Sequence, residues 1–333
     1  MFIVQLSAIL VLCLILIYST SLIVHSILAL ARTSRLGAYG ITAFILAIST
    51  SLPELFVSVV ASIEGNTSLV LGNIIGSNIA DIGLVIGGAA LIGGSLRVGN
   101  TIASRDVFLA GAAGLLPIFL IADGTLSRAD GVVLLVIYVI LVMTFLRSHQ
   151  RSLMQTVLSP SPIKRLLSAI TGRHSQGSIA KFVLGIALLL VSSHLIVRFS
   201  SALAGTSGIS TLFIGLFIVA VGTSLPELAF EIKAISAGHT TMALGDLLGS
   251  VVANSTLILG IAALIRPLTL TPRGLLPYGT AIGVFTTLYV TFIFFVRSKK
   301  RLEWWEGFIL LSVYLIFIFI EYLSQSSYVV SHL

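Results

Sequence analysis

Long apolar runs recur along the whole chain, and they restrict the folds that it can adopt. A helix needs about 20 apolar residues to cross the hydrocarbon core of a bilayer. Ten such segments can be drawn, at residues 4–30, 37–62, 67–93, 105–122, 130–146, 179–203, 208–235, 241–265, 274–296 and 305–323. Only 9% of the residues are charged, whereas a soluble domain carries about 25%. The sequence therefore excludes an ordinary soluble enzyme and predicts an all-α polytopic membrane protein with ten transmembrane helices.

The basic residues are concentrated in alternate loops. If the N-terminus lies outside, the inner loops hold fifteen Lys and Arg residues, whereas the outer loops hold three, Arg128, Arg266 and Arg273. Cytoplasmic loops of membrane proteins carry such an excess of positive charge. We therefore expect a multi-pass protein of the cell membrane with both termini outside. The formal net charge of +7 then reflects this orientation, and no nucleic-acid partner is expected.

A hexapeptide, TSLPEL, occurs twice, at residues 50–55 and 223–228. The two copies are 173 residues apart, and the segments GNIIGSNIADIG (72–83) and GDLLGSVVANST (245–256) keep the same separation. Two motifs at one offset indicate a duplication. Each half holds five predicted spans, so the second half would enter the membrane from the opposite side, as in the inverted repeats of many secondary transporters.

The duplication divides the chain into three parts. We expect a first repeat of five transmembrane helices over residues 1–146, a basic cytoplasmic linker over 147–178 and a second, inverted repeat of five helices over 179–333. The linker contains no acidic residue. At roughly 30 residues it is too short for a folded regulatory domain.

Each TSLPEL motif places a proline beside a glutamate within a predicted span. A proline inside a helix cannot donate a backbone hydrogen bond and kinks the helix. We therefore expect Pro53 and Pro226 to loosen nearby carbonyl groups, including those of Ala47 and Ala220. Carbonyl groups without partners are tolerated at membrane depth only where they are buried in protein or line a cavity. The motif thus indicates a polar site inside the membrane.

The side chains around these prolines supply oxygen atoms from both halves. Helical spacing puts Ala47, Thr50 and Glu54 on one face, with Ser51 beside them, and the second motif repeats the set. A carboxylate at mid-span is costly and usually functional, and hard oxygen donors suit Na⁺ and Ca²⁺. The predicted ligands of a transported cation are Ala47, Thr50, Ser51, Glu54, Ser77, Asp81, Ala220, Thr223, Ser224, Glu227, Ser250 and Asn254.

The motif pair resembles that of a known transporter family. TSLPEL followed by GN-x-x-GSN, with both motifs repeated in a second half, resembles the prokaryotic sodium/calcium exchangers of the cation/calcium exchanger superfamily. The resemblance implies a central core of kinked helices 2, 3, 7 and 8, across which helices 1 and 6 slide. It implies that Glu54 and Glu227 bind Ca²⁺ from opposite sides, and that the neighbouring Thr, Ser and Ala residues help to bind Na⁺. The implied function is exchange of Na⁺ for Ca²⁺ by alternating access.

Two features depart from the family pattern. Prokaryotic relatives commonly have Asn at the position of Asp81 and Asp at the position of Asn254, so the acid and the amide are exchanged in this chain and the total charge is preserved. Asp246 also stands where Asn is usual, and it could be an added ligand or a vestibule acid. These departures leave the coupling ion and the ion selectivity open.

Other functions are compatible with the same residues. An H⁺-coupled exchanger or a Mg²⁺ transporter could use this scaffold, and acids near the membrane midplane could line a cation channel. The inverted repeat with broken helices favours a carrier. An intramembrane hydrolase would need a nucleophile motif that the sequence lacks, so we expect no enzyme and no cofactor. The expected partners are Ca²⁺, Na⁺ and the lipid bilayer, and the protein is expected to function as a monomer.

Overall fold

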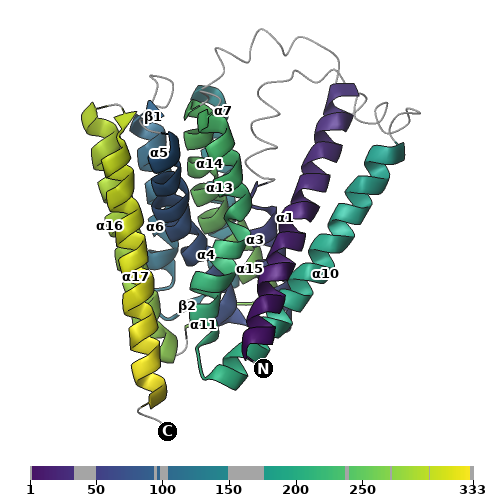
Figure 1. Ribbon diagram of the computed structural model, residues 1–333, viewed down its shortest axis with the longest axis vertical. Coiled ribbons are helices and arrows are strands. Elements are labelled where there is room, and N and C mark those ends of the chain that lie inside the picture. Colours follow the sequence, from purple (N-terminus) through teal and green to yellow (C-terminus); the bar gives the residue numbers. More distant parts are fainter. Residues whose placement is uncertain are drawn as a thin grey trace.

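The computed structural model describes residues 2–33, 50–93, 96–97, 104–148, 176–236, 240–270, 272–299 and 301–330. Helices account for nearly all of these residues (Figure 1). Those of the N-terminal half are α1 (Phe2–Thr33), α3 (Leu52–Glu64), α4 (Thr67–Ala80), α5 (Gly87–Gly93), α6 (Ser104–Leu120) and α7 (Arg128–Ser148). Those of the C-terminal half are α10 (Gln176–Ser207), α11 (Thr211–Phe213), α12 (Ala220–Thr223), α13 (Leu225–Ser236), α14 (Thr240–Val252), α15 (Leu259–Ile265), α16 (Pro272–Lys299) and α17 (Trp304–Val330). Three π-helical segments join consecutive helices: η1 (Asp81–Ile86), η2 (Ile214–Val219) and η3 (Ala253–Ile258).

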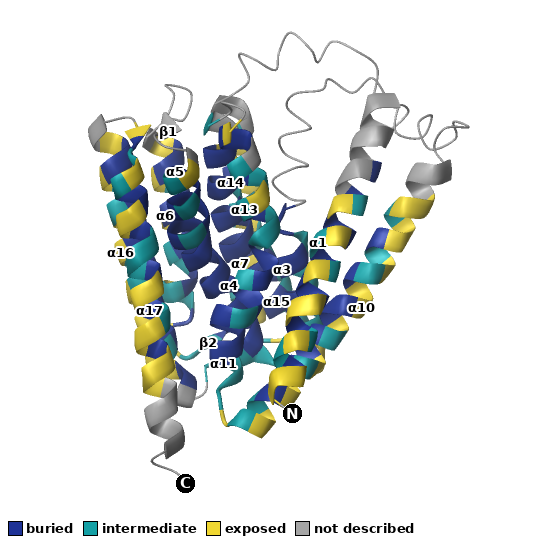
Figure 2. Ribbon diagram, in the orientation of Figure 1, coloured by how far each residue is buried: buried dark blue, intermediate teal, exposed yellow. Residues whose placement is uncertain are grey.

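The surface of the helical bundle is apolar. Eight helical stretches in the described part of the chain are long and apolar enough to cross a membrane. Large hydrophobic side chains point outward from several helices, and Ile3, Phe119 and Leu276 are each at least 74% exposed. Figure 2 shows exposed residues along the outer helices α1, α10, α16 and α17, around a buried centre. Such a surface is stable against lipid, so the protein is a multi-pass membrane protein.

Two of the predicted spans are not among these eight stretches. The span at 37–62 begins within residues 34–49, which lie outside the described residues, and only α3 represents its second part. The span at 105–122 corresponds to α6, which has 17 residues. The count of ten spans therefore stays a prediction. Most of the predicted linker, residues 149–175, also lies outside the described residues, while α7 and α10 contain its two ends.

Two short strand pairs join loops that are far apart in sequence. Strand β1 (Leu96–Arg97) pairs antiparallel with β4 (Arg301–Leu302), and β2 (Thr125–Leu126) pairs antiparallel with β3 (Leu268–Thr269). In Figure 1, β1 lies at the upper end of the bundle and β2 lies in its lower half. Each pair thus ties a loop of the N-terminal half to a loop of the C-terminal half.

Helix α4 is the most enclosed element of the bundle. Within Thr67–Ile92, 94% of the residues of the apolar window are buried, against 33% for α1. Gly76 shows how closely α4 is packed, because a Cβ atom added there would lie 2.4 Å from the carbonyl oxygen of Leu216. Small residues allow transmembrane helices to approach in this way. On the other flank, α1 and α10 lie side by side (Figure 1).

Candidate cation site

Each TSLPEL motif contains a break in the helix just before its proline. Ser51 has φ −83° and ψ 8°, and Ser224 has φ −83° and ψ 1°. Both residues therefore leave the α-helical region for a single position. Helix α3 begins directly after Ser51, and α13 begins directly after Ser224. The helix interruption predicted from Pro53 and Pro226 is thus confirmed, with the same backbone conformation in both motifs.

The carbonyl group of Ala220 is not freed by this break, so the expectation that the kink loosens it is wrong. Its oxygen accepts hydrogen bonds from the backbone amide of Ser224 at 2.9 Å and from Thr223 Oγ1 at 3.1 Å. A carbonyl oxygen has two lone pairs, and both are engaged. Pro226 has no amide hydrogen, so the hydrogen bond that is lost is the one to the carbonyl group of Gly222, four residues earlier. The amide of Ser224 still donates to the carbonyl group of Ala220.

The predicted ligands within the described part of the chain are all buried. Of the twelve, only Ala47 lies outside the described residues; the other eleven are each at most 6% exposed. They come from the two helix breaks, from the middle of α4 and from α14, with one at the start of each of η1 and η3. The structure therefore places these eleven residues inside the protein.

Three of these residues are buried carboxylates that have oxygen atoms without a hydrogen bond of good geometry. Glu54 is 1% exposed, Glu227 is 3% exposed and Asp81 is 1% exposed. Among the described residues, no donor bonds either oxygen of Glu54, either oxygen of Asp81, or Oε2 of Glu227. A buried ionised carboxylate is strongly unfavourable unless a cation or several donors compensate it. The arrangement is therefore suited to bind cations.

The threonine of each TSLPEL motif contacts the other half of the chain. Thr50 Oγ1 donates to Asp246 Oδ1 at 3.2 Å. At the positions 173 residues away, Thr223 Oγ1 lies 3.4 Å from Asn73 Oδ1. Asn73 and Asp246 each follow the first glycine of their GN-x-x-G or GD-x-x-G segment. The contact therefore occurs twice, from Thr50 of the first half to Asp246 of the second, and from Thr223 of the second half to Asn73 of the first.

The serines of the two motifs also lie against the opposite half. Ser51 Oγ is 3.4 Å from Ser250 Oγ of α14. Ser77 and Ser224 both face Glu54, and their hydroxyl oxygens have no hydrogen-bond partner among the described residues. Free hydroxyl oxygens next to a free carboxylate are the donor set that a Na⁺ or Ca²⁺ ion takes.

A hydrogen-bonded chain fixes the orientation of the Asn254 amide. Asn254 Nδ2 donates to Asn78 Oδ1 at 3.3 Å, and Asn78 Nδ2 donates in turn to Ser255 Oγ at 2.7 Å. Because the amino end of Asn254 is engaged in this way, its Oδ1 is left without a partner among the described residues. That oxygen is therefore available as a neutral ligand.

The prediction from sequence did not include Asn73 and Asn78 among the site residues. Both belong to the segment GNIIGSN, so the signal was present in the motif. Their role is to bond other site residues, which spacing along one helix does not reveal. Asp246 was singled out from the sequence without a definite role, and the structure makes it the partner of Thr50.

Two of the π-helical segments begin beside predicted ligands. Segment η1 starts at Asp81, and η3 starts at Ala253, directly before Asn254. Single π-helical turns inside α-helices are frequent at functional sites. The two long helices that carry the GN-x-x-G and GD-x-x-G segments therefore depart from α-helical geometry at equivalent places.

The carboxylates do not form a closed coordination shell in this conformation. Among the described residues, no three Asp, Glu, His or Cys side chains converge closely enough to hold a metal ion. Ca²⁺ takes about six to eight oxygen ligands. A Ca²⁺ site built on these residues would therefore also need hydroxyl, amide and carbonyl oxygens as ligands.

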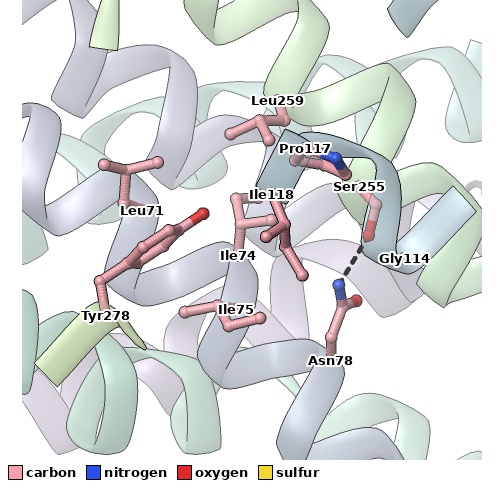
Figure 3. Close-up of a pocket in the computed structure, with 10 residues that line it drawn as sticks. All are labelled: Leu71, Ile74, Ile75, Asn78, Gly114, Pro117, Ile118, Ser255, Leu259 and Tyr278. Carbon is pink, nitrogen blue, oxygen red and sulfur yellow. Dashed lines mark hydrogen bonds between the residues drawn. The ribbon is translucent and has the colours of Figure 1, made fainter. Parts of the chain in front are cut away.

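A small pocket beside the asparagine chain is a poor alternative for an ion (Figure 3). It lies between α4, α6 and α16, and its lining includes Leu71, Pro117 and Tyr278. Asn78 and Ser255 are its neighbours on one side, where their hydrogen bond joins α4 to η3. The mostly apolar lining offers few oxygen ligands, so the pocket is a poorer candidate for a cation site than the buried carboxylates.

Comparison with known proteins gives consistent similarities. A sequence profile described as "Sodium/calcium exchanger protein" matches residues 4–147 and 177–323. The inner membrane protein YrbG of Escherichia coli (strain K12) is 32% identical over 293 residues, which cover 86% of this chain and 86% of YrbG. The sodium/calcium exchanger MaX1 of Methanosarcina acetivorans is 26% identical over 325 residues, which cover 89% of this chain and 92% of MaX1.

The fold is also similar to a solved exchanger structure. The sodium-calcium exchanger NCX_Mj, in crystals soaked with Na⁺ and Sr²⁺, aligns with a TM-score of 0.63 at 26% sequence identity. The alignment covers 95% of this chain and 98% of that chain. The similarity therefore extends over both halves and is not confined to the repeated motifs.

Proposed function

Because the chain belongs to the sodium/calcium exchanger protein family, we propose that it is an antiporter that exchanges Na⁺ for Ca²⁺ across the membrane by alternating access. The observation that carries this proposal is the set of buried carboxylate oxygens without partners that both TSLPEL motifs contribute, from Glu54 and Glu227. The names of MaX1 and NCX_Mj as sodium/calcium exchangers support the choice of ions. The family is one of exchangers, so we infer transport and no enzymatic reaction.

The proposed ligands divide by chemistry. Glu54 and Glu227 bind Ca²⁺, because a divalent cation neutralises two carboxylates at once. Hydroxyl and carbonyl oxygens bind Na⁺ together with these acids. The full proposed set is Ala47, Thr50, Ser51, Glu54, Ser77, Asp81, Ala220, Thr223, Ser224, Glu227, Ser250 and Asn254, eleven of which are buried in the described structure. Ala220 can contribute its carbonyl group only after one of its present hydrogen bonds is released.

The same carboxylates explain why transport of the two ions would be coupled. Without a cation, the buried acids carry negative charge that the protein interior does not compensate. A conformational change that encloses the empty site is then unfavourable, whereas one Ca²⁺ or a set of Na⁺ ions removes the penalty. The protein would therefore change sides only when it is loaded, which is the condition for exchange.

Contacts at equivalent positions support the proposed pair of inverted five-helix repeats. At the 173-residue offset, Leu96 of β1 corresponds to Thr269 of β3, and the two strand pairs lie at different levels of the bundle (Figure 1). A glycine contact recurs in the same way: Gly87 faces the Gly307 carbonyl group, and Gly260, 173 residues after Gly87, faces the Gly131 carbonyl group.

The ends of the chain support the proposed orientation. Figure 1 shows α1 beginning and α17 ending at the same, lower end of the bundle. The pair of β1 with β4, which carries Arg97 and Arg301, is at the opposite end. We therefore propose that the upper end faces the cytoplasm and that both termini lie outside. Since one chain supplies all the proposed ligands, we also propose that the monomer is the functional unit.

The test is Ca²⁺ uptake by the purified protein in liposomes under imposed ion gradients. We expect an outward Na⁺ gradient to drive ⁴⁵Ca²⁺ uptake that saturates with Ca²⁺, and an H⁺ gradient alone to drive none. Excess Mg²⁺ should compete weakly. Uptake driven by H⁺ and not by Na⁺ would instead support the H⁺-coupled exchanger, and flux without any counter-ion would support a channel.

Variants of the two glutamates test the site itself. Glu54→Gln and Glu227→Gln keep the side-chain shape but remove a charge that the divalent ion needs, so each should abolish uptake. Glu64→Gln is the matched control, because Glu64 ends the same helix α3 and contacts His194 of α10 instead of the site. Near-normal uptake in either site variant would refute the assignment.

A further inference from the structure

Two buried acids near the candidate site have no place in the exchange mechanism described above. Glu231 is 1% exposed and Asp246 is 4% exposed. Glu231 lies one helical turn beyond Glu227 in α13, and Asp246 lies one turn before Ser250 in α14. Both are thus displaced from the site toward the junction of α13 and α14. Among the described residues, neither acid forms an ion pair, and Glu231 Oε2 and Asp246 Oδ2 have no hydrogen-bond partner.

The first half of the chain shows how these two positions are related in space. At the 173-residue offset, Ser58 corresponds to Glu231 and Asn73 corresponds to Asp246. Asn73 Nδ2 donates to Ser58 Oγ at 3.2 Å, and both residues are fully buried. The two positions therefore face each other across α3 and α4, and in that half a neutral donor meets a neutral acceptor.

In the second half the same pair of positions holds two carboxylates. A carboxylate has no proton to donate when it is ionised, so Glu231 and Asp246 cannot reproduce the hydrogen bond of Ser58 and Asn73. Asp246 and Asp81 are both near enough to add negative potential at Glu231, and α13 packs against α14. Two like charges that are buried face to face are unfavourable unless a cation lies between them or one of the acids holds a proton. None of the polar residues that are buried in the described structure is basic.

We propose that Glu231 and Asp246 form a second binding site for a divalent cation, one helical turn from the transport site. The choice of Ca²⁺ as its ligand rests on the proposed function. Both acids offer a free oxygen, and the other oxygen of Asp246 accepts the hydrogen bond of Thr50. Thr50 therefore connects the second site to the TSLPEL motif.

The second site exists on one side of the bundle only. Its counterpart near the junction of α3 and α4 is the neutral pair of Ser58 and Asn73. Glu231 is closer than Glu227 to the end of the bundle where α13 ends. In the proposed orientation this is the cytoplasmic end.

The experiment is equilibrium ⁴⁵Ca²⁺ binding to the full chain, purified in detergent without Na⁺. We expect the wild-type protein to bind two Ca²⁺ ions per chain. The double variant Glu231→Gln with Asp246→Asn, which is nearly isosteric, should bind one. Glu231→Ser with Asp246→Asn reproduces the neutral pair of the first half, so it should also fold and bind one. Glu64→Gln should bind two.

Each outcome of this experiment bears on the second site, on the transport site or on both. The second site is overturned if the wild-type protein binds one Ca²⁺ ion per chain, or if both double variants still bind two. Glu231 and Asp246 would then share a proton instead of a cation. If Glu54→Gln removes the single ion that a double variant retains, the transport site is supported independently. If the wild-type protein binds no Ca²⁺, the proposed function fails as well, so failure of the second site and failure of the exchanger assignment are distinguishable.

Discussion

Exchanging the acid and the amide at positions 81 and 254 tests whether the two halves meet at one symmetric site. The perturbation is the double variant Asp81→Asn with Asn254→Asp, which keeps the number of buried acids. Both residues are 1% exposed, and both stand at the start of a π-helical segment. If the two positions are equivalent, the charge should be tolerated on either side.

The hydrogen-bonded chain around Asn254 determines the energetic outcome. Asn78 Oδ1 accepts from Asn254 Nδ2, so a carboxylate at position 254 would face an amide oxygen. Asn78 can remove this conflict by turning its amide through about 180°. Its Nδ2 would then donate to the new carboxylate, and Ser255, which now accepts from Asn78, would donate instead, because a hydroxyl group can do either.

The magnitudes of the two opposing effects nearly cancel. A hydrogen bond to a charged group contributes about 1.5–3 kcal/mol, whereas one between neutral groups contributes about 1 kcal/mol. Rotation of the Asn78 amide would therefore stabilise the variant by about 1 kcal/mol. The new acid would stand eight residues from Asp246, about 12 Å along a helix at about 1.5 Å per residue. At an effective dielectric constant of about 20, repulsion over that distance is about 1.4 kcal/mol. The net change is below about 1 kcal/mol, so Ca²⁺ affinity should change by less than about tenfold.

The assay is Ca²⁺ uptake as a function of pH for the double variant and both single variants. The double variant should retain substantial transport. Asp81→Asn alone removes a central charge and should weaken or alter ion coupling. Asn254→Asp alone adds an acid to a crowded site, where joint ionisation is disfavoured, so H⁺ should compete more strongly with Ca²⁺. If the double variant transports no better than the worse single variant, the symmetric-site reasoning is refuted.

Two further predictions concern orientation and packing. A cysteine at Ser152, placed in a Cys13→Ser background, should be labelled by an impermeant thiol reagent only after the cytoplasmic side is opened; labelling from outside intact cells would contradict the proposed orientation. Gly76→Ala should lower the unfolding temperature in detergent, because its Cβ atom would lie 2.4 Å from the Leu216 carbonyl oxygen and overpacking costs about 1–3 kcal/mol. Gly279→Ala is the control, since no atom lies within 4 Å of its added Cβ, and equal unfolding temperatures would refute the packing argument.

Apolar run length was a good guide to where the described helices lie. The span predicted at 67–93 corresponds to the continuous helical stretch from Thr67 to Gly93, and the span predicted at 130–146 lies within α7. Hydropathy did not reveal which helices are enclosed by protein. One third of the apolar window of α1 is buried, whereas 94% of that in Thr67–Ile92 is buried. Sequence hydropathy does not separate the two, because lipid and the protein interior select similarly apolar residues.

The motifs identified the buried polar residues but not their partners. The sequence placed Glu54 and Thr50 on one helical face, and both are buried in the structure. The bond of Thr50 to Asp246 spans 196 residues, so no local pattern encodes it. The Ala220 carbonyl was misjudged for a related reason. Helix geometry shows which donor a proline removes, but the structure is needed to show which donors are still in reach.

The differences between the halves follow a single electrostatic pattern. The second half has acids at positions 231 and 246, where the first has the neutral pair of Ser58 and Asn73. At the equivalent positions 81 and 254, the first half has the acid, Asp81, and the second half has the neutral Asn254. The second half therefore supplies three of the five buried acids around the site, Glu227, Glu231 and Asp246, and the first half supplies two, Glu54 and Asp81. In the proposed second site, Glu231 and Asp246 would hold a cation between the transport site and the end of the bundle where α13 ends. In the proposed orientation, the second half would therefore offer an additional pair of anionic ligands toward the cytoplasm, whereas the first half, with the neutral pair of Ser58 and Asn73, would offer none toward the outside.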